Sequence, residues 1–492
     1  MTVGYVDLVP SAPPPPPPSY EELAALVVEL KLLVSAQAVT IAELTARNAE
    51  QAERIAELER QVASDSRNSS KPPSSDGLGK KPAPKSLRQR SGRKPGRAKG
   101  DPGGRLEQVA DPDVILDHHP GACGGCGNDL AGAVSTGYRA RQVFDLPKIA
   151  PQVTEHRLHR AVCGCGHTTS ATPPEHVPAA TVYGSGVRAA ICYLSAYQHL
   201  PAKRLAEAMD SLFGLPLSTG TVLSVLARAH DGLAGFEEQA KEHLIAAPVA
   251  HADESGVRVA GKLHWLHVMC TRLVTFYGIH TKRGREAMDG LGVLPAFTGT
   301  LVTDALASYT VYGNSKALCG AHVLRELIAV TEDTRRDPTW ATTMIQVLIE
   351  AKTAVADAVA SGQDALAADV LVGFQDRYRH ATLCGIAANP YSGTGPRAKA
   401  RALAERLHDR TEEYQRYMTD FSVPFDNNQA ERDLRMIKTQ QKVSGSWRTL
   451  SGARRFARIR SYISTVRKHG INPLTALRDL FVGRPWMLPT TS

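Results

Sequence analysis

The chain lacks both kinds of segment that would direct it into or across a membrane. No run of apolar residues is long enough to span a bilayer, and the first residues lack a positive region followed by an apolar core. We therefore expect a cytosolic chain with no membrane partner. Disulfides are rare in that compartment, so closely spaced members of its eight cysteines are candidate metal ligands.

Acidic residues are also absent from positions 77–100, where nine Lys and Arg residues occur. The formal net charge of the whole chain is +9, so this one segment accounts for all of it. A local basic segment predicts contact with a polyanion such as DNA, and a solubilising tether is the alternative. The residues selected here as DNA contacts are Lys80, Lys81, Arg93 and Lys94.

Length and composition predict several domains, because 492 residues are too many for one hydrophobic core. The expected fold class is multidomain α+β. In chain order we expect a proline-rich disordered segment (1–19), a coiled coil (20–64), a basic disordered linker (65–104), a zinc-binding domain (105–180), a helix-turn-helix-like domain (181–245), an α/β core (246–470) with a helical insertion at about 320–420, and a C-terminal tail (471–492).

Residues 20–64 carry an apolar heptad repeat. The a positions hold Val27, Val34, Ile41, Asn48, Ile55 and Val62, and the d positions hold Leu23, Leu30, Gln37, Leu44, Gln51 and Leu58. This pattern is typical of a parallel two-stranded coiled coil, because position a holds mostly β-branched residues and a single Asn, and position d holds mostly Leu. We therefore expect a homodimer. The two Gln residues in the seam leave an amphipathic helix packed on its own domain as the alternative.

Four cysteines lie in two short glycine-rich turns: Cys123, Cys126, Cys163 and Cys165. Two thiolates at such spacing can occupy adjacent corners of a tetrahedron, and a second pair completes a structural Zn2+ site. The second pair is closer than the usual spacing, so a histidine can replace one thiolate. The alternative ligands are His156, His159 and His167.

Residues 184–230 are expected to be helical. Helices are predicted at 186–197 and 201–212, and a third begins after Ser218, a good N-cap residue, and runs to about residue 229. The short turn at 213–217 matches helix-turn-helix geometry, which binds DNA. A plain three-helix packing unit fits the same pattern.

From residue 247 the apolar period becomes that of β-strands. Runs at 248–253, 257–260, 263–270 and 273–280 predict an antiparallel meander, in which the first two runs can be one bent strand. A helix at 282–291 and a strand at 299–304 follow. This β-β-β-α-β order, with an acid at the end of the first and fourth strands, is the RNase H-like plan.

Three carboxylates are the candidate catalytic groups of that core. If the strands that carry Asp253 and Asp304 are neighbours, both side chains project into one site and can share Mg2+ ions that promote in-line phosphoryl displacement. Glu431 can supply a third oxygen ligand from a helix beside the sheet. Glu254 follows Asp253 directly; strand alternation sends its side chain the opposite way, but a helper role stays open.

The segment 427–438 is predicted to be that helix. Asn427 can cap its start, and Ala430, Leu434 and Ile437 fall on one apolar face, whereas Glu431 falls on a face with cations. Taken alone, this pattern also fits a solvated helix. Elsewhere, Cys319 and His322 lie one helical turn apart and can ligate a metal, but a packing role is the preferred interpretation.

Two blocks of sequence are highly specific: Val-Pro-Phe-Asp-Asn-Asn-Gln-Ala-Glu-Arg-Asp-Leu-Arg at 423–435 and Phe-Ala-Arg-Ile-Arg-Ser-Tyr at 456–462. With the Ser-Ser-Lys-Pro-Pro-Ser-Ser-Asp-Gly linker at 69–77 and the cysteine-rich segment, they resemble the transposases of the insertion sequence sixty-six group, within the DDE superfamily. The resemblance implies that Asp253, Asp304 and Glu431 bind Mg2+ or Mn2+, that the core is RNase H-like, and that the protein cuts and joins transposon ends.

Cations accumulate again after Glu431 and are interleaved with aromatic residues, which predicts a basic DNA path beside the acids. By resemblance to the superfamily, Lys438 contacts the phosphates of the DNA ends, and Arg455 and Arg458 are expected to face outward. A solvated helix face is the alternative. The DNA contacts selected in this region are Arg435, Lys438, Lys442, Arg455 and Arg458.

The function that these features predict is a dimeric, metal-dependent DNA transposase of the bacterial cytoplasm, associated with the nucleoid. Its expected partners are the terminal inverted repeats of a transposon and target DNA, with accessory transposition proteins as a further candidate class. The alternative is a zinc-containing DNA-binding regulator, or a catalytically inactive transposase relic whose acids only support the fold.

Overall fold

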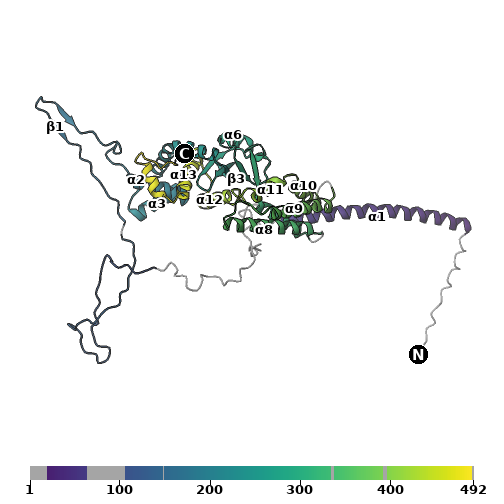
Figure 1. Ribbon diagram of the computed structural model, residues 1–492, viewed down its shortest axis with the longest axis horizontal. Helices are drawn as coiled ribbons and strands as arrows, with labels where there is room; N and C mark the ends of the chain where they lie inside the picture. The colour runs from purple at the N-terminus through teal and green to yellow at the C-terminus, as the bar shows by residue number, and fades with distance from the viewer. Residues whose placement is uncertain (1–18, 64–105, 148, 334–336, 392–395, 490–492) are drawn as a thin grey trace, which may run out of the picture. The chain divides into compact units, whose positions relative to one another are not determined.

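The computed structural model describes residues 19–63, 106–147, 149–333, 337–391 and 396–489 (Figure 1). The described residues form fourteen α-helices and a mixed five-stranded sheet, together with a separate two-stranded sheet. Contacts divide the chain into two units, Met1–Gly77 with Lys316–Asp426, and Leu78–Ser315 with Asn427–Ser492. Of the predicted segments, 1–18 and the whole basic linker (65–104), with its Lys80, Lys81, Arg93 and Lys94, lie outside the described residues.

The first unit is helical. It contains the long helix α1 (Tyr20–Ala63) and the shorter helices α7 (Gly320–Thr331), α8 (Thr339–Ala360), α9 (Ala368–Ala388), α10 (Pro396–Asp409) and α11 (Thr411–Thr419). Helices α7 to α10 pack against one another in sequence order, and Arg406 of α10 binds Glu326 of α7 at 2.7 Å. Trp340, Tyr378 and Leu407 are buried between these helices.

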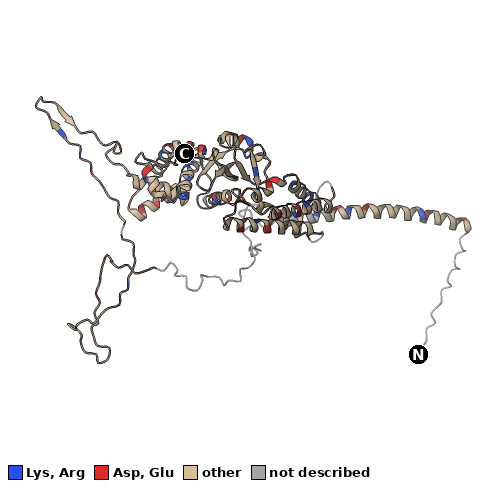
Figure 2. Ribbon diagram, in the orientation of Figure 1, with Lys and Arg blue, Asp and Glu red and all other residues tan. Residues whose placement is uncertain are grey.

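The apolar heptad residues of helix α1 from Leu23 to Leu58 are exposed, and Figure 2 shows α1 as a mainly uncharged helix with scattered charges. Its stretch Leu23–Ala52 is long and apolar enough to cross a membrane by length and composition alone, which corrects the expectation that the chain holds no such segment. Alanines and the heptad Leu, Val and Ile residues outnumber the charges, so the stretch is apolar on average although no uninterrupted apolar run is long.

The second unit begins with a two-stranded antiparallel sheet, β1 (Arg160–Val162) and β2 (Thr168–Ser170), whose connecting turn holds Cys163 and Cys165. Four helices follow: α2 (Ser185–Cys192), which continues as the π-helix η2 (Tyr193–Tyr197), α3 (Ala202–Phe213), α4 (Thr219–Gly232) and α5 (Ala234–Ile245). As predicted, Ser218 caps α4, because its hydroxyl accepts the N–H of Thr221 at 3.0 Å.

The five-stranded sheet has the order β5-β4-β3-β6-β7. Its strands are β3 (Val249–Val259), β4 (Lys262–Cys270), β5 (Thr275–His280), β6 (Thr300–Thr303) and β7 (Ser315–Leu318). β3 is antiparallel to β4 and parallel to β6, and the crossover between β5 and β6 carries α6 (Arg285–Leu291). The two runs at 248–253 and 257–260 are therefore one strand, and Asp253 lies inside it rather than at its end.

Three C-terminal helices complete the second unit: α12 (Asn428–Ser444), α13 (Leu450–Lys468) and α14 (Pro473–Leu480). α12 packs on β3 and β4, and α13 packs along β5 and against α4 (Figure 1). The edge strand β5 is covered by side chains of α13: the backbone N–H groups of Thr275 and Tyr277 donate to the hydroxyls of Thr465 and Ser461 at 3.1 and 2.9 Å. These bonds block strand addition at this edge.

Candidate functional site

The pairing of β3 with β6 brings two of the predicted acids together. In this parallel pair, Val249 lies opposite Thr300 and His251 lies opposite Val302. Asp253 follows His251 by two residues, and Asp304 follows Val302 by two residues. The two acids therefore occupy equivalent positions just beyond the paired residues. Both side chains are partly buried. The structure therefore places the two acids at one end of one strand pair.

Each of these carboxylates is oriented by the backbone. Oδ1 of Asp253 accepts the N–H of Glu254 at 2.8 Å, and Oδ1 of Asp304 accepts the N–H of Leu306 at 3.0 Å. Within the described part of the chain, the second oxygen of each acid has no hydrogen-bond donor. Each acid thus keeps one oxygen available for a ligand.

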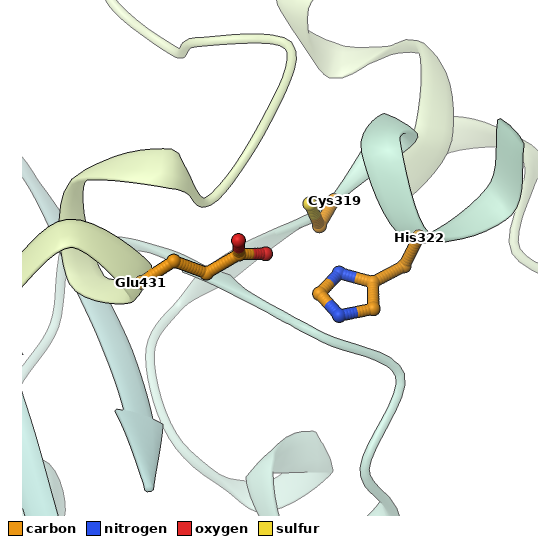
Figure 3. Close-up of side chains that lie close together, drawn as sticks. All are labelled: Cys319, His322 and Glu431. Carbon is orange, nitrogen blue, oxygen red and sulfur yellow. The ribbon is translucent and has the colours of Figure 1, made fainter. Parts of the chain in front are cut away.

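Glu431 is the third acid, in the first turn of α12, and Figure 3 shows its side chain extending from that helix. Burial raises the pKa of Asp253 well above its usual range, and the charges of Glu254, Asp304 and Glu431 add to that rise, while the N–H of Glu254 opposes it. The three predicted acids therefore interact electrostatically. A group of carboxylates that is partly buried and mutually repelling fits hard divalent cations, which bind several carboxylate oxygens.

The helix α12 is fixed to β3 through Asn427. Its amide donates to the carbonyl of Ala252 at 2.9 Å, and its Oδ1 lies 2.9 Å from Nδ1 of His251. Asn427 stands at the N-cap position, as predicted, but its side chain does not cap the helix. The expected apolar face of the helix is buried, with Ala430, Leu434 and Ile437 in the core.

Glu254, whose role the sequence leaves open, has both carboxylate oxygens bound within the protein. Its side chain is only 1% exposed and binds Arg283 at 2.8 Å, and its second oxygen accepts the hydroxyl of Tyr309 at 2.6 Å. Burial and the charge of Asp304 raise the pKa of Glu254, whereas Tyr309 and Arg283 lower it. Sequence reasoning did not select Arg283, Tyr309 or His251, because no motif spacing marks them.

The predicted DNA contacts after Glu431 divide into two groups. Arg435 and Lys442 are exposed on α12 and Arg455 is partly exposed on α13. Lys438 is partly buried, and burial lowers its pKa.

Arg458, by contrast, does not face outward as expected. Its guanidinium binds both carboxylate oxygens of Glu237 at 2.7 and 3.1 Å and the carbonyl of His230 at 2.9 Å. Apolar spacing places this residue on the outer face of α13, but α4 and α5 cover that face, so Arg458 holds those helices together.

The cysteine turns are shaped by backbone hydrogen bonds. The carbonyl of Cys123 accepts the N–H of Gly127 at 2.9 Å, and the carbonyl of Cys163 accepts the N–H of Gly166 at 2.8 Å. The N–H of Cys126 lowers the pKa of the Cys123 thiol, and the N–H of Cys165 likewise lowers that of Cys163. Both effects favour the thiolate, the form that binds metal.

In the first unit, Cys319 stands at the N-cap position of α7 and His322 lies in the first turn of that helix (Figure 3). A ligand-type atom of Cys319 lies within 4.8 Å of one of His322. Cys319 is buried, and its ligand atom and that of His322 are close enough to bind one metal ion, which was the alternative to a packing role.

Comparison with known protein families gives three matches. The model described as Transposase IS66 family matches residues 180–455, more than half of the chain, and includes all three acids. A model described as the zinc-finger binding domain of transposase IS66 matches residues 120–166, which include all four cysteines of the two turns, and a family of unknown function matches residues 12–107. No curated protein matches the chain.

Proposed function

We propose that this chain, which belongs to the IS66 transposase family, cuts the ends of an insertion sequence and joins them to target DNA. The observation that carries the proposal is the parallel register of β3 and β6, which leads to Asp253 and Asp304, with Glu431 contributing to the same electrostatic site. The sheet order places the first strand between the second and the fourth, as an RNase H-like core requires. We assign that fold to residues 246–470, with the helical insertion at about 320–420.

Asp253 and Asp304 would hold Mg2+ or Mn2+ through the carboxylate oxygens that are not used by the backbone, and Glu431 would supply the third carboxylate. Such ions, when bound, activate an attacking oxygen and stabilise the leaving oxygen of a phosphodiester. The residues of the chain do the positioning: β3 and β6 fix two acids, and Asn427 holds α12 so that Glu431 reaches the same site.

The DNA-binding surfaces follow from the same assignment. We assign phosphate contacts to Arg435, Lys438, Lys442 and Arg455 and to the basic linker at 65–104. The zinc-finger domain (105–180) and the helices of 181–245, in a helix-turn-helix arrangement, are assigned to recognition of the terminal inverted repeats, with Zn2+ on Cys123, Cys126, Cys163 and Cys165. Transposase membership suggests a protein of the cytoplasm, and association with the nucleoid is part of the proposal.

Helix α1 is assigned to a parallel coiled-coil homodimer, because its exposed heptad residues would be buried by a second copy. Light scattering of the full chain tests this. A dimer that becomes monomeric when Leu30 and Leu44 are replaced by Glu is the expected result, and an unchanged mass would reject the assignment.

The catalytic proposal is tested with purified full-length protein, DNA that carries the terminal repeats, and Mg2+. We expect 3′-end nicking and joining by the wild type, and loss of both in Asp304→Asn with DNA binding retained. Asp289→Asn is the matched control, because Asp289 binds Tyr312 outside the site. A wild type that binds the repeats without cutting them would favour the alternative, a zinc-containing DNA-binding regulator or an inactive relic.

A further inference from the structure

Three residues that the proposed mechanism does not use form a closed polar cluster next to the acids. Glu254 lies at its centre, with one carboxylate oxygen bound by Arg283 and the other by the hydroxyl of Tyr309, at 2.8 and 2.6 Å. Its side chain is 1% exposed, so water does not compete for these bonds. Both oxygens of Glu254 are occupied by donors, which argues against this residue as a metal ligand.

The cluster joins three separate segments of the core. Glu254 belongs to β3 and immediately follows Asp253. Arg283 lies between β5 and α6, and its guanidinium stacks on the ring of Trp265 in β4 at 4.9 Å. Tyr309 belongs to the short helix η4 (Ala307–Val311), in the segment that begins with Asp304.

The link from Tyr309 back to Asp304 is short. Tyr309 is buried, and its backbone N–H donates to the carbonyl of Leu306 at 3.1 Å. Leu306 in turn donates its N–H to the carboxylate of Asp304 at 3.0 Å. A shift of Tyr309 would therefore move the segment that orients the Asp304 carboxylate.

We propose that Glu254, Arg283 and Tyr309 are positioning residues, which together hold the Asp304 segment against β3 and so set the separation of the Asp253 and Asp304 carboxylates for divalent metal binding. The inference rests on the proposed function. β6 is only four residues long and pairs with β3 before the acids are reached, so the ladder alone does not fix the segment that follows Asp304. The Glu254 cluster supplies the missing connection on the far side of the acids.

The cluster also has an electrostatic consequence. Arg283 pairs with Glu254, so the acid nearest to Asp253 in the chain already has its counter-ion within the protein. Arg283 therefore does not neutralise the negative charges of Asp253 and Asp304, which are the charges that would attract the cation. The second oxygen of Glu254 accepts a hydrogen bond from Tyr309, a neutral donor, so the cluster adds no second positive charge that would repel a metal.

The test is Tyr309→Phe, with Tyr312→Phe as its matched control. Both tyrosines are buried and each donates its hydroxyl to a carboxylate, but Tyr312 binds Asp289 at 2.8 Å rather than Glu254. Mn2+ binding to the full chain without DNA is measured by calorimetry. Asp304→Asn keeps every metal site except the acidic one, so its signal is subtracted to leave binding at that site. End nicking is then measured as a function of Mg2+ concentration.

We expect Tyr309→Phe to weaken Mn2+ binding by about tenfold or more, in the range found when groups that support metal ligands are removed. The Mg2+ concentration for half-maximal nicking should rise by a similar factor, and the rate at saturating Mg2+ should stay close to that of the wild type. Tyr312→Phe should change neither quantity. Equal metal dependence in Tyr309→Phe and wild type, or equal shifts in both tyrosine variants, would overturn the proposal.

Arg283→Lys decides the matter if Tyr309→Phe does not fold. It keeps the charge but loses the planar guanidinium that reaches Glu254 and stacks on Trp265, so it should weaken Mn2+ binding in the same direction. Unchanged Mn2+ binding in folded Arg283→Lys would reject the inference. Failure of the proposed function looks different, because wild type and Asp304→Asn would then bind Mn2+ alike or the wild type would bind it without nicking DNA.

Discussion

Lys468, the last residue of α13, lies 2.8 Å from a carboxylate oxygen of Asp433, two residues after Glu431 in α12. The same oxygen accepts the hydroxyl of Thr275 in β5 at 3.0 Å, and the lysine also donates to the carbonyl of Thr271 at 2.8 Å. The hydroxyl of Tyr277 donates to the backbone carbonyl of Asp433 at 2.7 Å. This largely buried cluster joins two helices to one strand and fixes the helix that carries the third acid.

Replacing Lys468 by Met should therefore destabilise the protein by about 3 kcal/mol, because it leaves a largely buried carboxylate without its counter-ion. Urea unfolding of the wild type and variant measures the change. The double variant with Asp433→Asn should lose less than the sum of the two single changes. A cost below about 1 kcal/mol for Lys468→Met would show that the pair behaves like a surface ion pair.

Asp253→Asn should raise the thermal stability of the metal-free protein and strongly slow nicking. The folded protein raises the pKa of Asp253 from its ordinary value of 3.8, so the unfolded chain gives up this proton first as the pH rises. The wild type thus loses stability relative to the variant between that value and the raised pKa, and the difference is constant above it. The nicking rate should fall on the order of a thousandfold, because the loss of a metal-binding carboxylate raises the activation barrier by several kcal/mol.

Melting temperatures of the two proteins between pH 3 and pH 8 without metal check the first part. A difference that shrinks as the pH rises would contradict the assigned cause. Saturating Mn2+ should reverse the order of stability, because it stabilises only the protein that retains the carboxylate.

Lys442→Ala and Arg458→Met test two different roles: we assign Lys442 to DNA contact and Arg458 to stabilisation of the fold. Lys442 is exposed on α12, and its removal should lower DNA affinity and reduce the slope of log K against log salt by about 1. Arg458 binds Glu237 with both side chains largely buried, so its removal should cost about 3 kcal/mol of stability and leave the slope unchanged. Salt titrations of DNA binding and urea unfolding give the two numbers, and a changed slope in Arg458→Met would restore its predicted DNA contact.

Cys163→Ser should remove the bound zinc of the purified chain, whereas His167→Ala should retain it. The carbonyl of His167 accepts the N–H of Cys163 at 2.9 Å, so the contribution of this histidine to the turn is made by its backbone. Elemental analysis of both variants and of the wild type decides between the thiolate set and its histidine alternatives. Zinc lost in His167→Ala and kept in Cys165→Ser would reverse the assignment.

The local patterns in the sequence predicted most of the elements that build the site. Strand alternation and turn residues located β3 to β6, and helical spacing located the buried face of α12, because these features depend only on neighbours along the chain. Alternation along the strand predicts that Asp253 and Glu254 point to opposite faces. In the structure the two side chains have different partners, because Asp253 accepts a backbone N–H whereas Glu254 binds Arg283 and Tyr309.

Contacts between distant residues were beyond the reach of those patterns. Glu254 meets residues 29 and 55 positions away, and Arg458 meets Glu237 at a separation of 221. A charged residue on an amphipathic helix is read as solvated when its partner is unknown, which is why Arg458 was assigned to DNA. The strand β7 is not predicted, because its sequence Ser-Lys-Ala-Leu lacks the β-branched residues that mark the equally short β6.

The placement of α12 after Asp426 has a consequence for synthesis of the protein. A ribosome that has completed residues 1–426 has made the strands with Asp253 and Asp304, but not the helix with Glu431 or the helix α13 that covers the edge of β5. The nascent chain therefore holds an open sheet and two of the three assigned acids. A product that stops at residue 426 would therefore be able neither to cover the edge of β5 nor to supply the third assigned acid, and it would not cut DNA.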